Sequence, residues 1–191
     1  MKLRNPLKNA LVVINFFVFF AEYAIANETV LLSQTIEETK GGVFFYDDLK
    51  NSFLPAVKGM KIEKPTLFQT SENGEIIFSC IGKISARVSA NARVLLSPGI
   101  NGRYEVELRK GTITASLDPN RPEGSPIFAI RTFAGVTEAT GTLFAVTEYK
   151  GQSYTAVKKG TIKKQTQPPT KPDFSAYLMK PKSKPTSSSK K

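Results

Sequence analysis

The sequence predicts an all-β domain of many short strands, arranged either as a β-solenoid-like coil or as a two-sheet sandwich. Three observations predict this fold class. Apolar and polar residues alternate with a period of two in several stretches, which is the spacing of a strand with one buried face. Glycine, asparagine and proline separate these stretches at intervals of about ten residues. After Leu67, no stretch of about ten residues or more places apolar side chains at helical spacing.

Residues 1–26 have the form of a secretory signal peptide. Basic residues come first, an apolar run over residues 10–21 follows, and the small residues Ala24 and Ala26 precede the expected cleavage site. The alternative is an uncleaved membrane anchor, but a span requires about 20 apolar residues and Glu22 interrupts this stretch. We therefore expect a signal peptide that is removed on export.

The first part of the domain, which is expected to begin at residue 27, has the least regular pattern. A strand is expected at Val43–Tyr46, because two glycines precede it and the charged pair Asp47–Asp48 follows it as a turn. Residues 29–56 hold the only candidate short helices, and the segment around Glu37 has too little periodicity for an assignment. A further short strand is expected within residues 60–67.

From residue 71 onwards the pattern becomes regular. Asn73–Gly74 predicts a tight turn, because both residues tolerate positive φ angles, and it introduces a strand at Glu75–Ile81. The next segment, Ile84–Ala90, alternates apolar and polar residues and is expected to be a half-buried strand.

The same alternation recurs on both sides of Lys110–Gly111, which we expect to turn the chain between two strands. These strands are predicted at Tyr104–Leu108 and Ile113–Leu117. Two prolines and a glycine within residues 118–124 predict a surface loop. The strand Ile127–Thr132 follows, with alternate residues sharing one face.

A six-residue pattern occurs twice in the domain. Leu108–Ile113 and Val157–Ile162 match in residue type at all six positions, and they lie 49 residues apart. Two copies are fewer than a repeat array needs. The match therefore reflects either coincident turn chemistry or a chain that winds twice past the same structural place.

The positive charge of the chain is concentrated at its C-terminal end. The full chain has a formal net charge of +11. Residues 27–163 account for +3 of it, and residues 164–191, which are rich in Pro, Ser and Lys, account for +6. A domain with so little net charge lacks the clustered positive surface that is typical of nucleic-acid binders, so no nucleic-acid partner is expected. The C-terminal segment is expected to be a disordered basic tail that can contact polyanions.

Catalytic and metal-binding patterns are not found in the sequence. It contains no histidine and one cysteine, Cys80, which we expect to be a small buried residue, with an intermolecular disulfide as the alternative. Adjacent carboxylates such as Asp47 and Asp48 point to opposite faces of a strand, which disfavours a carboxylate-based hydrolase. We therefore expect no enzyme active site, no cofactor and no metal ion.

Residues 125–163 carry the most specific pattern in the chain. Its parts are RTFAGV at 131–136, GTLFAV at 141–146, and a strand over 154–162 that is closed by a glycine and a β-branched residue. In these parts the sequence resembles the FecR-type domain of iron-dicitrate sensor-like proteins, and a weaker likeness extends upstream to Val43. The fold-defining residues that the resemblance implies are Arg131, Thr132, Gly135, Gly141, Thr142, Phe144, Val146 and Gly160.

The resemblance implies a module of the bacterial cell envelope. Well-known members of the family are signalling proteins with a cytoplasmic anti-sigma segment, a membrane helix and this domain in the periplasm. Because few residues precede the apolar run here, we expect a stand-alone, periplasmic or secreted, non-enzymatic module without a stable membrane span after cleavage. Its expected partner is an envelope protein or glycan. The alternative is a membrane-anchored signalling component related to anti-sigma and iron-transport regulators.

Overall fold

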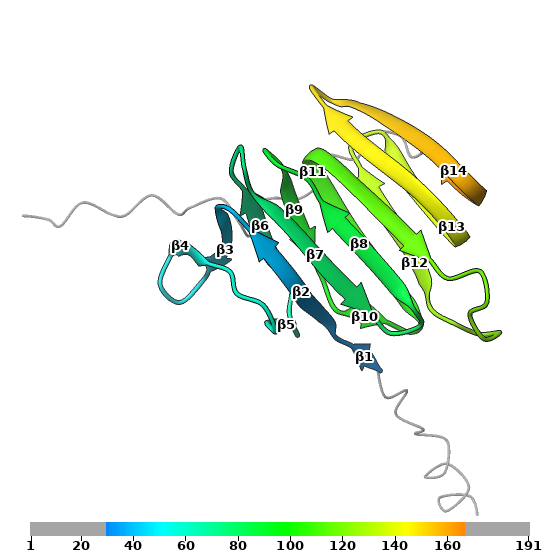
Figure 1. The fold of residues 1–191 in the computed structure, drawn as a ribbon, viewed down its shortest axis with the longest axis horizontal. Coiled ribbons are helices and arrows are strands. Elements are labelled where there is room, and N and C mark those ends of the chain that lie inside the picture. The colour runs from blue at the N-terminus through cyan, green and yellow to red at the C-terminus, as the bar shows by residue number, and fades with distance from the viewer. Residues whose placement is uncertain (1–29, 167–191) are drawn as a thin grey trace, which may run out of the picture. The chain divides into compact units, whose positions relative to one another are not determined.

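The computed structural model describes residues 30–166 and shows an all-β fold, which confirms the predicted class (Figure 1). No helix occurs in that range. The predicted signal peptide with Ala24 and Ala26 lies outside the described residues. Of the tail predicted for residues 164–191, Lys164 and Gln165 belong to the last strand, and residues 167–191 lie outside the described range. The strands are β1 (Leu31–Leu32), β2 (Gln34–Lys40), β3 (Val43–Asp47), β4 (Ser52–Pro55), β5 (Lys61–Ile62), β6 (Thr66–Thr70), β7 (Glu75–Cys80), β8 (Ile84–Val88), β9 (Arg93–Leu96), β10 (Gly99–Ile100), β11 (Arg103–Leu117), β12 (Ile127–Thr132), β13 (Gly135–Tyr149) and β14 (Gln152–Gln165).

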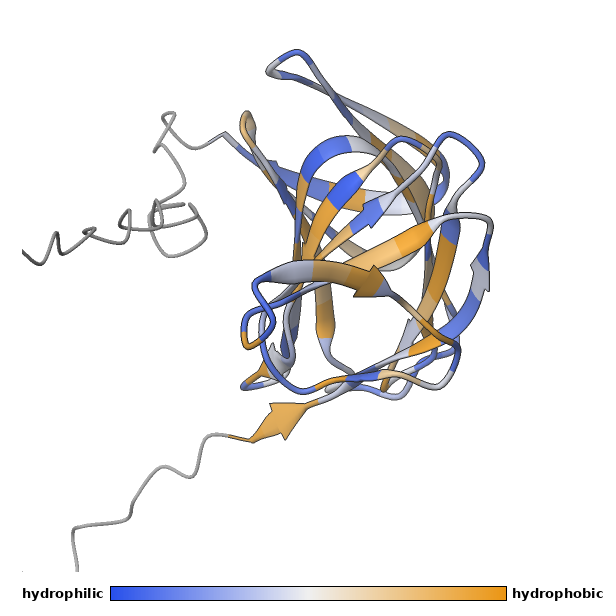
Figure 2. Ribbon diagram, turned by 90° about the vertical axis from the view of Figure 1, so that its left-hand side faces the viewer, coloured by the Kyte–Doolittle hydropathy of each residue, from blue (hydrophilic) through white to orange (hydrophobic). Residues whose placement is uncertain are grey.

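The strand β11 belongs to both layers of a folded sheet. Its first half pairs with β9 and β12, and its second half pairs with β8 and β13. The first layer runs in the order β4, β3, β6, β9, β11, β12, β13, β14, and the second in the order β5, β2, β7, β8, β11, β13, β14. The strands surround a common interior (Figure 2). Since the described ladders are antiparallel except for β11–β12, the fold matches the predicted sandwich more closely than a solenoid of parallel coils.

The passage of β11 from one layer to the other occurs at Gly111. The pairing register shifts between Leu108 and Lys110, and Gly111 has a φ of 97°. A Cβ atom added to Gly111 would lie 2.5 Å from the Cβ of Ala92, so neither the backbone angle nor the space admits a side chain. The predicted turn at Lys110–Gly111 is therefore wrong: the chain bends there within one continuous strand, whose apolar residues stay buried on both sides of the bend.

A second passage between the layers is made by β13 and β14. The start of β13 pairs with β12 and its end pairs with β11. Its pairing with β14 shifts register between Thr140 and Leu143, which places Gly141–Thr142 in a bulge. Gly160 of β14 lies beside this bulge and has a φ of 95°. The two copies of the six-residue pattern thus place their glycines at two different passages between layers, in the same left-handed backbone conformation.

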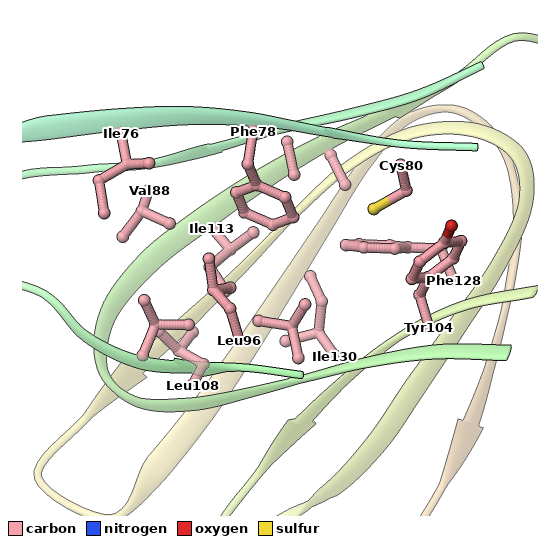
Figure 3. Packing of buried hydrophobic residues seen from close by; sticks show 14 of the residues in the cluster. Ile76, Phe78, Cys80, Val88, Leu96, Tyr104, Leu108, Ile113, Phe128 and Ile130 are labelled. Carbon is pink, nitrogen blue, oxygen red and sulfur yellow. The ribbon is translucent and has the colours of Figure 1, made fainter. Parts of the chain in front are cut away.

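The core lies between the two layers and is held by side chains from both. Phe78 of β7 and Phe128 of β12 lie with their ring centroids 6.4 Å apart (Figure 3). Tyr104 of β11 is fully buried; its hydroxyl accepts a hydrogen bond from the backbone N–H of Ile81 at 3.1 Å and donates one to the carbonyl of Ser33 at 3.4 Å. The one polar atom of this large side chain is therefore satisfied inside the core.

Cys80 lies in the same core cluster, near Tyr104 and Phe128 (Figure 3). It is a free, buried cysteine, as the sequence predicts. Burial raises the pKa of its thiol to about 12, because the charged thiolate is poorly solvated there. A thiol that is buried and protonated is poorly placed for the alternative, an intermolecular disulfide.

The structure corrects the interpretation of the segment before residue 57. The short helices considered for residues 29–56 are absent from the described part of that range, residues 30–56, which forms β1 to β4. In β2 the pairing with β7 shifts between Ile36 and Glu38, so the side-chain alternation is interrupted in the middle of the strand. This bulge explains why the periodicity around Glu37 gave no assignment. The loop predicted for residues 118–124 is confirmed, and so are strands at the other predicted positions.

Candidate functional site

The residues that carry the sequence motif lie together in the last three strands. Arg131 and Thr132 end β12, and Gly160 lies in β14. The remaining five lie along β13: Gly135, Gly141, Thr142, Phe144 and Val146. We call β12, β13 and β14 with their connecting turns the closing unit. The structure gathers the motif there, while the role of each residue as a fold determinant stays a prediction.

The first turn of the closing unit joins β12 to β13 through two residues. Thr132 pairs with Gly135 across the ends of the two strands, and its hydroxyl donates a hydrogen bond to the Gly135 carbonyl at 3.2 Å. Gly135 has a φ of 140°, a conformation that residues with a Cβ rarely adopt. The threonine and the glycine thus close the two-residue turn between β12 and β13.

Two motif residues face the core. Phe144 and Val146 are buried, and they pair with Ala115 and Ile113 of β11. Together these side chains attach the second half of β13 to the centre of the sheet. Their task is packing, in agreement with the one-sided strand that the sequence predicts for this segment.

Arg131 belongs to a charge network on the outer face of the first layer. Its Nε lies 2.5 Å from Glu105 Oε1 of β11. Arg103 contacts the same carboxylate at 3.3 Å and also Glu138 Oε1 of β13 at 2.5 Å. Two arginines and two glutamates thus join three adjacent strands. Burial opposes the charged form of Arg103, but its hydrogen bonds and its attraction to Glu138 and Glu105 raise the pKa above the ordinary value.

This network covers the sheet instead of forming a reactive pocket. Ala129 of β12, which lies across from Glu105 and Glu138, is fully buried although its face of the sheet points outward. The carboxylates of Glu105 and Glu138 are each engaged by a guanidinium group. Sequence reasoning missed the network because its members lie up to 35 residues apart.

Glu148 connects the two turns of the closing unit. It is 3% exposed and lies between Gly111 of β11 and Ser153 of β14. Its carboxylate accepts hydrogen bonds from the backbone N–H groups of Phe133, in the first turn, and Gly151, in the turn between β13 and β14. Burial raises the pKa of Glu148 above its usual value, and the two N–H donors lower it by less. Its Oε2 atom has no hydrogen-bond partner among the described residues.

The outer boundary of the closing unit is β14. Among the described strands it pairs with β13 alone, so its other edge is open along 14 residues (Figure 1, orange). Most of its side chains are exposed on both faces. The edge carries the lysines Lys158, Lys159, Lys163 and Lys164, and no ion pair of these four is found within residues 30–166.

A second open edge lies at β4, at the far end of the first layer. Its outward residues include Phe53, whose ring meets that of Tyr46 edge-on with centroids 5.3 Å apart. Phe44 of β3 is also partly exposed on this hairpin. This edge is four residues long and ends in Pro55, which has no N–H to donate, so it offers few sites for a further strand.

The carboxylates Asp47 and Asp48 serve the turn after β3. Asp47 Oδ1 accepts hydrogen bonds from the backbone N–H groups of Leu49 and Lys50, at 2.9 and 3.1 Å. Asp48 pairs with Lys64 at 3.2 Å on the surface. In the part of the chain that the structure describes, no group of three or more His, Cys, Asp or Glu side chains is placed to hold a metal ion.

Residues 30–166 contain no helix that is both long and apolar enough to span a bilayer.

The comparison with known protein families agrees with this architecture. The family described as FecR protein matches residues 67–163, which run from β6 into β14 and include the closing unit except its last two residues, Lys164 and Gln165. No curated protein sequence matches the chain. Domains of the matched family are sensor and signalling modules, and they typically lie in the periplasm as parts of envelope regulators. Because the match covers more than half of its residues, this chain belongs to the FecR family.

Proposed function

We propose that the protein is an exported, non-enzymatic FecR-domain module that binds a protein or glycan of the cell envelope as a sensor or scaffold. The observation that carries this proposal is the family match over residues 67–163. Domains of this family are sensor and signalling modules, and we infer from this that the domain recognises a component of the envelope. In this protein the domain would follow the predicted signal peptide of residues 1–26.

Export is supported by the pattern of residues 1–26, with Ala24 and Ala26 at the positions that signal peptidase reads. The test is mass spectrometry of the N-terminus of the protein purified from its host. We expect a chain that begins at Asn27. A chain that retains residues 10–26 would contradict export by cleavage and would favour a membrane-anchored signalling component instead.

A binding role without catalysis is supported by the state of the acidic side chains. Glu105 and Glu138 are held by arginines, and Asp47 accepts hydrogen bonds within its own turn. General acid–base catalysis requires a titratable group that can reach a substrate. These carboxylates instead fix strands and turns in place.

The basic tail is proposed to tether the module to polyanions of the envelope. Residues 164–191 contain seven basic residues and one acidic residue. Binding of the full chain to isolated envelope fractions should therefore weaken as the salt concentration rises. A chain that ends at Gln165, the last residue of β14, is the matched comparison. Equal binding of the two chains at low salt would remove the tether from the proposal, while loss of all binding in both would remove the binding function itself.

A further inference from the structure

The open edge of β14 is unusual for its length. This strand is fourteen residues long and pairs with β13 on one side and with no other described strand. Each open edge presents unpaired N–H and C=O groups, which are a template for another strand. Folded proteins generally keep such edges short, as at β4 here, or cover them. A long edge that is left open is therefore a candidate interaction surface.

The inner face of β14 continues the core beyond the last buried strand. Thr155, Val157 and Ile162 pair with Val146, Phe144 and Ala139 of β13, which are all buried. Cross-strand partners share a face of the sheet, so the three β14 residues extend the apolar row of β13. Val157 is nevertheless 42% exposed. A further strand beside β14 would cover this side chain while it pairs the backbone.

The charge of the edge restricts what that strand can be. Four lysines lie within residues 158–164. The two glutamates that β13 places nearest to β14 are already engaged, Glu138 by Arg103 and Glu148 by two backbone N–H groups. Lys163 lies opposite Glu138 in the ladder, yet none of the four lysines forms an ion pair with a carboxylate in the described part of the chain. An incoming segment with acidic side chains would supply the missing counter-charges.

Other occupants of the edge fit less well. A second copy of β14 would bring lysines against lysines, and like charges on paired strands are destabilising. The chain's own segment after β14, residues 167–191, is also basic in its sequence, with six basic residues and one acidic residue. Neither segment complements the edge.

We propose that β14 is a strand-accepting edge, and that an extended acidic segment of a partner protein adds to it as a further strand. Main-chain hydrogen bonds to the β14 edge provide affinity, and alternate apolar side chains of the partner cover Val157 and Ile162. The acidic side chains, on the other face of the added strand, meet the β14 lysines that share that face, such as Lys163 opposite Glu138, and determine which partner is accepted. This inference rests on the proposed binding function and names the chemistry of its partner.

The test uses the full chain and a synthetic peptide of about ten residues, a usual strand length, in which Glu and Val alternate. Its affinity is measured by fluorescence anisotropy, and amide hydrogen exchange locates the binding site. Three further probes accompany it: a Lys–Val peptide of the same length, a Glu–Val peptide with N-methylated amides along one edge, and a polyanionic polysaccharide. We expect the Glu–Val peptide to bind and to slow exchange in β14. The Lys–Val and N-methylated peptides should bind at least about tenfold more weakly, because one lacks the charge and the other the backbone donors.

Two variants with the same change in charge test the site on the protein. Lys158→Glu combined with Lys163→Glu should weaken binding of the Glu–Val peptide roughly tenfold, because two attractive contacts become repulsive. The control is Lys58→Glu combined with Lys61→Glu, two exposed lysines near β5, and it should change the affinity by less than about twofold. Thermal unfolding of both variants confirms that the fold is kept.

Three results would overturn the strand-accepting edge. One is equal affinity for the N-methylated and the parent Glu–Val peptide, together with binding of the polysaccharide. That result would mean that the surface binds anions through charge alone, without backbone pairing. Another is equal loss of binding in the two charge variants. The last is exchange protection outside β14. If the Glu–Val peptide does not bind while the full chain still binds envelope fractions, the strand-accepting edge is wrong and the proposed binding function is retained.

Discussion

Strands β11 and β14 have almost the same length, 15 and 14 residues, and contain the same six-residue pattern with a glycine in the left-handed conformation. Their environments are opposite. Each half of β11 has a neighbour on both sides, whereas β14 pairs with β13 alone among the strands of residues 30–166 and is exposed along its length. The local pattern thus specifies how a strand bends where it passes between layers. Whether the strand becomes part of the core or a surface depends on which other strands arrive beside it.

The largest difference between the two strands is expected at their glycines. Gly111→Ala should lower the free energy of unfolding by about 3 kcal/mol, because it combines an unfavourable φ with a clash against Ala92. Gly160→Ala should cost about 1 kcal/mol from the backbone angle. Urea denaturation measures both. Equal costs would mean that the position of β11 in the core adds nothing to the requirement for glycine.

Apolar truncations provide the next comparison. Val106→Ala in β11 should cost about 2 kcal/mol, since the side chain is fully buried and its removal leaves a cavity. Val157→Ala in β14 should cost about 0.5 kcal/mol, because much of that side chain is already in water. The measurement is again the urea midpoint at constant m-value. A larger cost at Val157 would indicate that β14 is covered in solution.

Charge substitutions should have a smaller effect. Glu105→Gln in β11 removes the carboxylate shared by Arg103 and Arg131 and should cost about 1 kcal/mol at low salt. Lys159→Gln in β14 should change stability by less than about 0.5 kcal/mol. Thermal unfolding at low and high salt tests the pair, because screening should reduce the cost at Glu105. A cost that does not respond to salt would contradict an electrostatic role for the network.

The smallest effect is expected at Glu148, which lies between the two strands. Its pKa in the folded state is raised by burial, so the folded protein holds a proton there more tightly than the unfolded chain does. The contribution of this group therefore becomes more favourable as the pH falls through its folded pKa, and it is unfavourable at neutral pH. Glu148→Gln should raise stability at neutral pH and remove this pH-dependent component. If the free energies of unfolding of the wild-type protein and of Glu148→Gln changed in parallel between neutral and mildly acidic pH, burial would not destabilise the charged carboxylate.

The sequence predicts the regular strands because their period is uninterrupted. Ile84–Val88 and both halves of β11 alternate cleanly, and these are the strands with one face on the core. It fails at β2, where a bulge after Ile36 breaks the period, and at short strands such as β4. It also mistakes the bend at Gly111 for a turn, because a glycine with positive φ serves either purpose.

The site is predictable only in part for a different reason. The motif residues of β12, β13 and β14 are close in sequence, so a pattern identifies them. The charge network joins Arg103 to Glu138, and such a contact depends on strand order and register, which no local pattern encodes. The open edge of β14 is likewise invisible in the sequence, since an edge is defined by the absence of a neighbouring strand along the described sheet.

The pairing of β13 with both β11 and β12 has a consequence for how the chain acquires its structure during synthesis. The strand β11 (residues 103–117) cannot complete its pairing until residues 143–148 of β13 have been synthesised. Contacts between such distant segments close slowly, because the entropy of the intervening loop is lost before the contact forms. Until then the apolar rows of β11 and β12 each lack one partner, a state that is prone to aggregation. A ribosome that stalls before residue 135 would therefore leave an aggregation-prone nascent chain. The dependence of this chain on chaperones should end once the last quarter of the domain has emerged from the ribosome.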